Sequence, residues 1–130
     1  MFKPIFTAEA PAPIGPYSQA VAINGLVFLS GQIPLSPLTG EVVGSTAAEQ
    51  VVQVLANLCA VLEASGSRPS QVVKTTIFLT DLADFAAVNA AYGKVFGVDG
   101  PAPARSTVQV VALPKGVKVE IEAVALVTEQ

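Results

Sequence analysis

Residues 117–127 alternate hydrophobic and polar side chains in a pattern that predicts a strand with two different faces. Successive side chains of a strand point to opposite faces of its sheet. One face carries Val117, Val119, Ile121, Ala123 and Ala125. The other face carries Lys118, Glu120, Glu122, Val124 and Leu126. The first face is typical of a core. The second begins charged and turns apolar, which indicates that another surface covers its apolar part.

Two further apolar runs predict a β-hairpin. They are residues 18–23 and 26–33, and Asn24-Gly25 lies between them. Asn-Gly between such runs favours a two-residue type I′ turn. The proline-rich residues 8–16 and the segment 34–40 are expected to be loops.

Apolar residues at helical spacing predict two helices. The first spans residues 46–65, with a capping box at Thr46 and Glu49 and a stop at Gly66. Its apolar stripe consists of Val51, Val52, Leu55, Leu58, Cys59 and Leu62. The polar residues expected to lie away from this stripe are Gln50, Gln53 and Asn57. The second helix begins after Asp81 or Asp84, and its apolar positions are Phe85, Val88, Tyr92, Val95 and Phe96.

The order of elements predicts an α+β domain. Residues 71–80, 105–113 and 117–127 are expected strands, and residues 41–44 are a short additional one. The order β-β-(β)-α-β-α-β-β allows both helices to cover one face of a mixed sheet. The other face would carry Val111, Leu113, Val124 and Leu126, so we expect other copies of the chain to cover it.

Pairing of the last two strands as a hairpin would fix their register. If Ala112 pairs with Val117, then Gln109 opposes Glu120, Thr107 opposes Glu122 and Arg105 opposes Val124. Arg105 and Glu120 would then share a face at a separation of roughly 13 Å along the ladder. One small ligand cannot span this distance. Either a bulge shifts the register, or the two residues meet across a subunit boundary.

The composition favours one oligomeric domain over residues 1–130. Hydrophobic residues make up 52% and charged residues 13%, whereas about a quarter of an average domain is charged. A net charge of −3 without a basic run argues against a general nucleic-acid binder. The absence of histidine and the single cysteine exclude histidine bases, intrachain disulfides and cysteine metal clusters. Without an apolar run of about 20 residues or a signal-peptide pattern, we expect a cytoplasmic protein and no membrane partner.

A few residues could carry chemistry, and each also has a plain structural interpretation. Arg105 is either a strand-end charge or structural ion pair, or a receptor for a carboxylate. Glu120 and Glu122 are either an exposed face or a base that acts on water. Ser30 is either a turn residue before Gly31 or a hydrogen-bond donor to a small polar ligand, and Tyr17 follows Ile14-Gly15-Pro16. Asn89 is, on its own, an exposed helix residue.

Four segments together resemble the YjgF/RidA family of reactive-intermediate deaminases. They are residues 14–20 (IGPYSQA), 30–41 (SGQIPLSPLTGE), 80–92 (TDLADFAAVNAAY) and 103–125 (PARSTVQVVALPKGVKVEIEAVA). The resemblance covers essentially the whole chain. It implies a chorismate-mutase-like α+β fold of the bacillus type, with a mixed six-stranded sheet and two helices on one face. It also implies a homotrimer with a central barrel and ligand clefts between subunits.

The family resemblance implies cofactor-independent hydrolysis of 2-imino and 2-enamino acids, such as 2-iminopropanoate and 2-aminoacrylate, to 2-keto acids and ammonia. Arg105 would bind the substrate carboxylate, and Glu120 would orient the attacking water. The other implied cleft residues are Tyr17 and Ser30, the backbone of Gly31 and Thr107, and Asn89. No metal is implied. Thr107 stands where many members have cysteine. If this position acts through its backbone, threonine preserves the function.

Two other functions remain open at this point. A non-catalytic sensor of small metabolites would keep Arg105 and would not need Glu120. An RNA-acting protein is a third possibility, since this activity is also attributed to some relatives. The negative net charge and the absence of histidine count against it.

Overall fold

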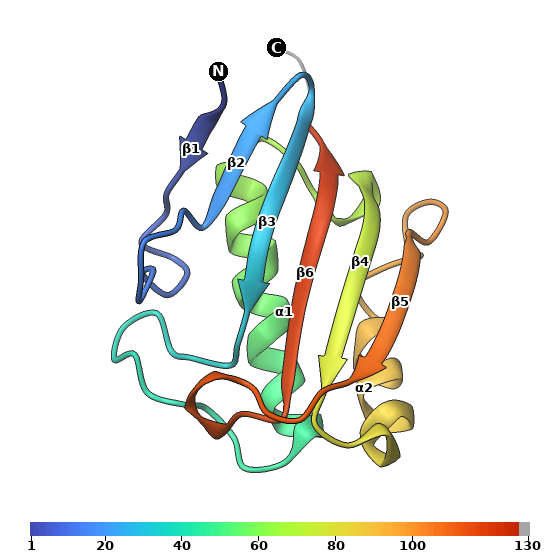
Figure 1. Cartoon of the computed structure of the whole chain (residues 1–130). Coiled ribbons are helices and arrows are strands. Elements are labelled where there is room, and N and C mark those ends of the chain that lie inside the picture. The colour runs from blue at the N-terminus through green and yellow to red at the C-terminus, as the bar shows by residue number, and fades with distance from the viewer. Residues whose placement is uncertain (128–130) are drawn as a thin grey trace.

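A six-stranded sheet with two helices on one face forms the computed structural model, which describes residues 1–127 (Figure 1). The strands are β1 Lys3–Ile5, β2 Ala20–Ile23, β3 Leu26–Gln32, β4 Val72–Leu79, β5 Ala104–Gln109 and β6 Val119–Leu126. The helices are α1 Ala47–Ala64 and α2 Phe85–Tyr92, and the short 3-10 turns are η1 Pro69–Gln71, η2 Leu82–Asp84 and η3 Pro114–Gly116. The strand order is β1-β2-β3-β6-β4-β5. Only β4 and β5 run parallel, so the mixed α+β sheet that the sequence predicts is confirmed.

Local sequence signals determine the first hairpin and the start of α1. Asn24 and Gly25 have φ values of 52° and 78°, as a type I′ turn requires, and Ile23 pairs with Leu26. At the start of α1, Thr46 Oγ1 accepts a hydrogen bond from the Glu49 amide and Glu49 Oε1 accepts one from the Thr46 amide, both at 3.2 Å. The predicted hairpin and capping box are both confirmed.

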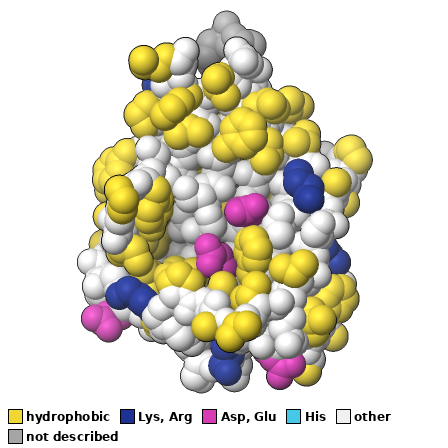
Figure 2. All heavy atoms as spheres, in the orientation of Figure 1, with side chains coloured by type: hydrophobic (Ala, Val, Ile, Leu, Met, Phe, Trp, Pro, Cys, Tyr) yellow, Lys and Arg dark blue, Asp and Glu magenta, His cyan; other side chains and the backbone are white. Residues whose placement is uncertain are grey.

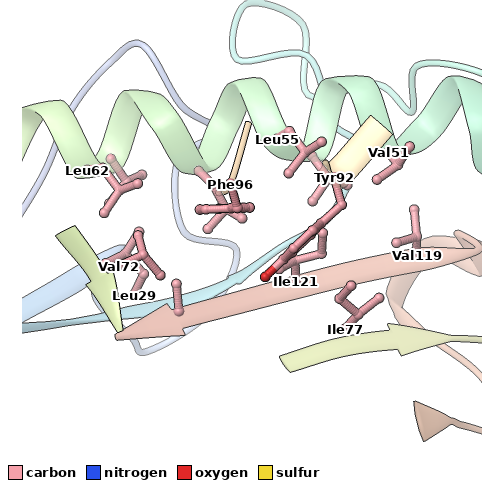
Figure 3. Close-up of a cluster of buried hydrophobic side chains, with 14 of the residues drawn as sticks. Leu29, Val51, Leu55, Leu62, Val72, Ile77, Tyr92, Phe96, Val119 and Ile121 are labelled. Atoms are coloured by element: carbon pink, nitrogen blue, oxygen red, sulfur yellow. The ribbon is translucent and has the colours of Figure 1, made fainter. Parts of the chain in front are cut away.

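The main core lies between α1 and the sheet. Figure 3 shows Leu55 and Leu62 of α1 facing Val72, Ile121 and Leu29 of the strands. By length and mean hydropathy alone α1 could also span a membrane, but half of it is buried inside the protein, as in the core helix of a soluble domain. Cys59 is only partly buried in this packing, and burial raises the pKa of its thiol.

The expectation that Gln50 and Asn57 point away from the buried face of α1 is wrong. They are 4% and 1% exposed, respectively. Asn57 Nδ2 donates to the carbonyl oxygens of Ile33 and Leu35 at 3.2 and 3.0 Å. Gln50 bonds the backbone of Gly44 and Lys118. Both amides are buried because they make hydrogen bonds to loop backbone groups that have no partner in the sheet.

The predicted pairing of the last two strands is also wrong. β5 ends at Gln109, and residues 110–118 cross the end of β4, so that β6 lies between β3 and β4. β4, α2 and β5 instead form a β-α-β crossover, which makes β4 and β5 parallel neighbours. Leu113 packs against the small cluster of Ile33, Leu35 and Val117 rather than on the open sheet face, and Val111 is fully exposed beyond the end of β5.

The register of β4 assigns Arg105 and Glu120 to opposite faces of the sheet. Phe78 pairs with both Val108 and Glu120, whereas Thr75 pairs with Arg105. Paired residues share a face and successive residues alternate. Arg105 therefore lies on the helix side and Glu120 on the open side.

The open face of the sheet is apolar over much of its area. Figure 2 views this face in the orientation of Figure 1 and shows hydrophobic side chains gathered across its upper part. Leu26 pairs with Leu126, and Phe28 pairs with Val124. Phe28 and Leu126 are 43% and 46% exposed, while the alternate residues of β6 are buried beneath the helices. The two-faced strand that the alternation predicts is confirmed.

Candidate functional site

A cavity of about 410 Å³ opens on the sheet face opposite the helices. Its lining residues are Ile14, Tyr17, Ser30, Gly31, Ile33, Pro114, Glu120 and Glu122. Figure 2 shows acidic side chains near the middle of this face, beside a hollow. The fold thus brings together four of the predicted site residues, Tyr17, Ser30, Gly31 and Glu120.

The end of β3 is shaped to receive the Glu120 carboxylate. The pairing of β3 with β6 shifts between Leu29 and Gln32, which indicates a bulge at Ser30 and Gly31. A Cβ atom at Gly31 would overlap the carboxylate, with Glu120 Cδ only 2.8 Å away. Only glycine allows this close approach. The carboxylate therefore lies directly against the Gly31 backbone.

The surroundings of Glu120 favour its protonated form. Burial raises the pKa of this carboxyl, and the negative charge of Glu122 raises it further. The two residues lie on one face of β6, and among residues 1–127 no cationic side chain lines their cavity. A carboxylate with a raised pKa is a stronger base toward water than an ordinary one.

Ser30 and Tyr17 differ in the hydrogen-bonding capacity that they leave for a ligand. Ser30 Oγ donates to the Ser18 carbonyl oxygen at 2.6 Å, so its proton is already used and its lone pairs can accept. The Tyr17 hydroxyl accepts from the Ile14 amide at 3.3 Å and keeps its own proton to donate. Tyr17 is half-exposed, so this donor can reach a ligand in the cavity.

Sequence reasoning missed the buried residue that holds the N-terminal wall of this region. Gln19 is 2% exposed. Its side chain accepts from the Thr7 amide at 2.7 Å and donates to the Thr7 and Pro11 carbonyl oxygens at 3.0 and 2.8 Å. The available signal was a lone amide side chain directly before the apolar strand β2.

Arg105 lies on the other side of the sheet, against α2. Its Nη1 donates to Asn89 Oδ1 at 2.7 Å. Its guanidinium carbon lies 4.9 Å from the ring centre of Tyr92 and 5.5 Å from that of Phe85. Among residues 1–127 these partners are all neutral, so the structural ion pair that the sequence left open is not formed there. The positive charge is free to bind an anion.

Thr107 follows Arg105 on the same face of β5. Its hydroxyl oxygen is buried and has no hydrogen-bond partner in the part of the chain that the structure describes. β5 is also the edge of the sheet, so part of its backbone is unpaired on the outer side. The edge beside Arg105 therefore offers backbone groups to a ligand or to another chain.

One chain thus carries two partial sites. The first is an anion receptor at Arg105 on the helix side of β5, and the second is the carboxylate cavity at Glu120 on the open side. β4 separates them in the sheet. Within residues 1–127, no three acidic, histidine or cysteine side chains are placed to hold a metal ion.

Comparison with known proteins gives consistent matches over nearly the whole chain. A family model described as endoribonuclease L-PSP matches residues 7–127. A 2-iminobutanoate/2-iminopropanoate deaminase of Escherichia coli is 50% identical over 127 residues, covering 97% of this chain and 98% of the relative. A putative regulator AldR of Lactococcus lactis is 50% identical over 123 residues, covering 95% and 96%. The crystal structure of E. coli TdcF with bound serine superposes with a TM-score of 0.91 at 44% identity, covering 97% and 99%.

Proposed function

The chain belongs to the endoribonuclease L-PSP family, which is the YjgF/RidA family that its sequence resembles, and we propose that it hydrolyses 2-imino and 2-enamino acids to 2-keto acids and ammonia. The observation that carries this proposal is the Glu120 carboxylate, held against Gly31 in a cavity that also contains the Tyr17 hydroxyl. The name of the E. coli relative gives independent support. The enzyme would act on imines such as 2-iminopropanoate.

In the proposed reaction, Arg105 binds the substrate carboxylate and Glu120 activates water. Charge-assisted hydrogen bonds from a guanidinium contribute about 1.5–3 kcal/mol each. Glu120 takes one proton as the water oxygen bonds to the imine carbon, whose C=N electrons move to nitrogen. This proton then passes to the nitrogen, which gives a carbinolamine. Glu120 next takes the hydroxyl proton of the carbinolamine and transfers it to the same nitrogen, the C–N bond breaks as the C=O bond forms, and ammonia leaves. An enamine first takes up a proton at its terminal carbon and loses one from its nitrogen to become the imine.

We place this site between two chains of a homotrimer, since Arg105 and Glu120 face opposite sides of the sheet in one chain. Arg105, Thr107 and Asn89 would come from one subunit, and Tyr17, Ser30, Gly31 and Glu120 from its neighbour. The uncovered apolar face around Phe28 and Leu126 supports a central barrel of packed sheets. The unpaired edge of β5 supports a cleft at its margin.

The proposal needs no metal or organic cofactor, since water is the only co-reactant. We also propose that the protein is cytoplasmic, where amino-acid metabolism would supply the imines. The substrate and the product are small carboxylates, which the cavity volume accommodates.

The test couples an amino-acid oxidase to the purified protein and follows the decay of the imine. Wild type should accelerate the decay, and Arg105→Ala and Glu120→Ala should each lose most of the acceleration. Arg68→Ala and Glu63→Ala, at exposed positions outside the cavity and Arg105 contacts, are matched controls. An unchanged decay rate with wild type, for imines of several side chains, would end the deaminase proposal.

A non-catalytic regulator is the second candidate, and the name of the L. lactis relative favours it. Such a protein would bind a 2-keto acid through Arg105 without accelerating imine decay. RNA cleavage, which the family description suggests, is less compatible with a net charge of −3. Incubation of wild type and the same variants with a labelled RNA separates RNA cleavage from the deaminase activity.

A further inference from the structure

One stripe of α2 lies along the side chain of Arg105. Phe85, Asn89 and Tyr92 are spaced four and three residues apart, so they share one face of the helix. All three contact the guanidinium, two through their rings and one through its amide oxygen. A strand-end arginine on a solvated surface would have no such set of partners.

The three partners leave the charge and most of the donors of Arg105 unused. A guanidinium has five N–H donors in its own plane. Asn89 takes one of them on Nη1, and the aromatic rings interact through their faces rather than as acceptors in that plane. None of the three is a carboxylate. Within residues 1–127 the remaining donors have no acceptor, so they can bind a planar, bidentate anion.

Tyr92 is itself anchored to the strand that pairs with Arg105. Its hydroxyl and Thr75 Oγ1 are 2.6 Å apart, and Thr75 is completely buried. Thr75 pairs with Arg105 in the parallel register of β4 and β5. Burial raises the pKa of the Tyr92 hydroxyl, which keeps it neutral beside the cation. The Tyr92 ring thus contacts the Arg105 guanidinium, while its hydroxyl bonds β4, the strand that pairs with Arg105.

We propose that Phe85, Asn89 and Tyr92 position the Arg105 guanidinium so that its free donors are fixed for the carboxylate of a 2-imino or 2-keto acid. This inference rests on the proposed function in its choice of ligand. Asn89 acts here through Arg105, since its amide oxygen accepts a hydrogen bond from Nη1. Lysine cannot replace Arg105 in this arrangement, since its ammonium lacks the planar fork.

The experiment measures the affinity for pyruvate by calorimetry and the KM and kcat for imine decay. Phe85→Leu and Asn89→Ala should each weaken pyruvate binding by about three- to tenfold, because each removes one contact that orients Arg105 while the guanidinium itself remains. KM should rise more than kcat falls. Tyr92→Phe retains the ring but loses its anchor on Thr75, so it should weaken pyruvate binding less than Tyr92→Leu, which loses the ring as well. Ala90→Ser, at an exposed position on α2, is the control.

The same substitutions are also made together with Arg105→Ala, and the residual kcat/KM is measured. This separates the positioning of Arg105 from a general loss of structure. If the three residues act through Arg105, Phe85→Leu and Asn89→Ala should have no further effect in that background. Losses of the same size with and without Arg105 would overturn the inference, as would wild-type pyruvate affinity in both variants. Wild type that binds pyruvate without accelerating imine decay would refute the deaminase and leave the positioning test intact. Wild type that does not bind pyruvate would overturn the inference itself.

Discussion

At the scale of single residues, the contact between Gly31 and Glu120 determines where the carboxylate can lie. We predict that Gly31→Ala lowers kcat/KM for imine decay by about 100-fold, because the new methyl group must displace the carboxylate by about 1 Å or more. Gly15→Ala is the control, since a Cβ there meets nothing closer than 3.6 Å. Unchanged kcat/KM in Gly31→Ala would show that the position of Glu120 is not critical.

Glu122 has a residue-scale role through its charge. This charge raises the pKa of Glu120, and no other charged side chain in the described part of the chain lines the cavity. Lys74, which is on β4 and on the same face of the sheet, bonds Ser106 instead. Removing the Glu122 charge should lower the pKa of Glu120, so Glu120 stays ionised, and able to act as a base, at lower pH. We therefore predict that Glu122→Gln shifts the acidic limb of the kcat/KM profile to lower pH. A limb that stays in place or moves to higher pH would contradict this coupling.

At the scale of elements, the buried amide of Asn57 joins α1 to the start of the loop after β3. We predict that Asn57→Leu lowers the free energy of unfolding by about 2–4 kcal/mol, because two buried carbonyl oxygens lose their donor. Urea denaturation measures this loss. Gln53→Leu, which removes only the bond to Asn57 itself, is the milder comparison. Equal stability of Asn57→Leu and wild type would mean that water replaces the amide.

The elements also show which parts of the fold are readable from sequence. The Asn24-Gly25 turn and the Thr46 cap depend on neighbours within four residues, so the sequence predicts both. The burial of Asn57 depends on carbonyl groups 22 and 24 residues away, which no helical pattern contains. The position of β6 depends on a crossing loop, and a hairpin was the simpler prediction for two successive strands. This error assigned Arg105 and Glu120 to the same face.

The candidate site was partly predictable for the same reason. Alternation along β6 places Glu120 next to an apolar surface, but only the resemblance distinguishes it from Glu122. Nothing local indicates that Tyr92, an apolar position of a helix, would contact Arg105. Its role depends on the parallel pairing of β4 and β5, a contact between distant segments.

At the scale of the whole molecule, the apolar open face should determine assembly. We predict that Phe28→Asp produces a monomer without deaminase activity, because a charge there cannot be buried between sheets without a large cost. Light scattering measures the mass, and Val52→Asp on the outer side of α1 is the control that should stay trimeric. An active trimer of Phe28→Asp would refute the proposed barrel.

Because Arg105 and Glu120 lie on opposite faces of the sheet, two inactive variants should complement each other when they assemble together. In a closed ring, a cleft that takes Arg105 from one subunit and Glu120 from the next is intact wherever an E120A chain meets an R105A chain in the right order. Refolding the two variants together at equal amounts should then restore roughly a quarter of wild-type activity, as random mixing in a cyclic trimer gives. Each variant refolded alone should stay inactive. If mass spectrometry showed mixed trimers without any recovery, both residues would have to serve a site within one subunit.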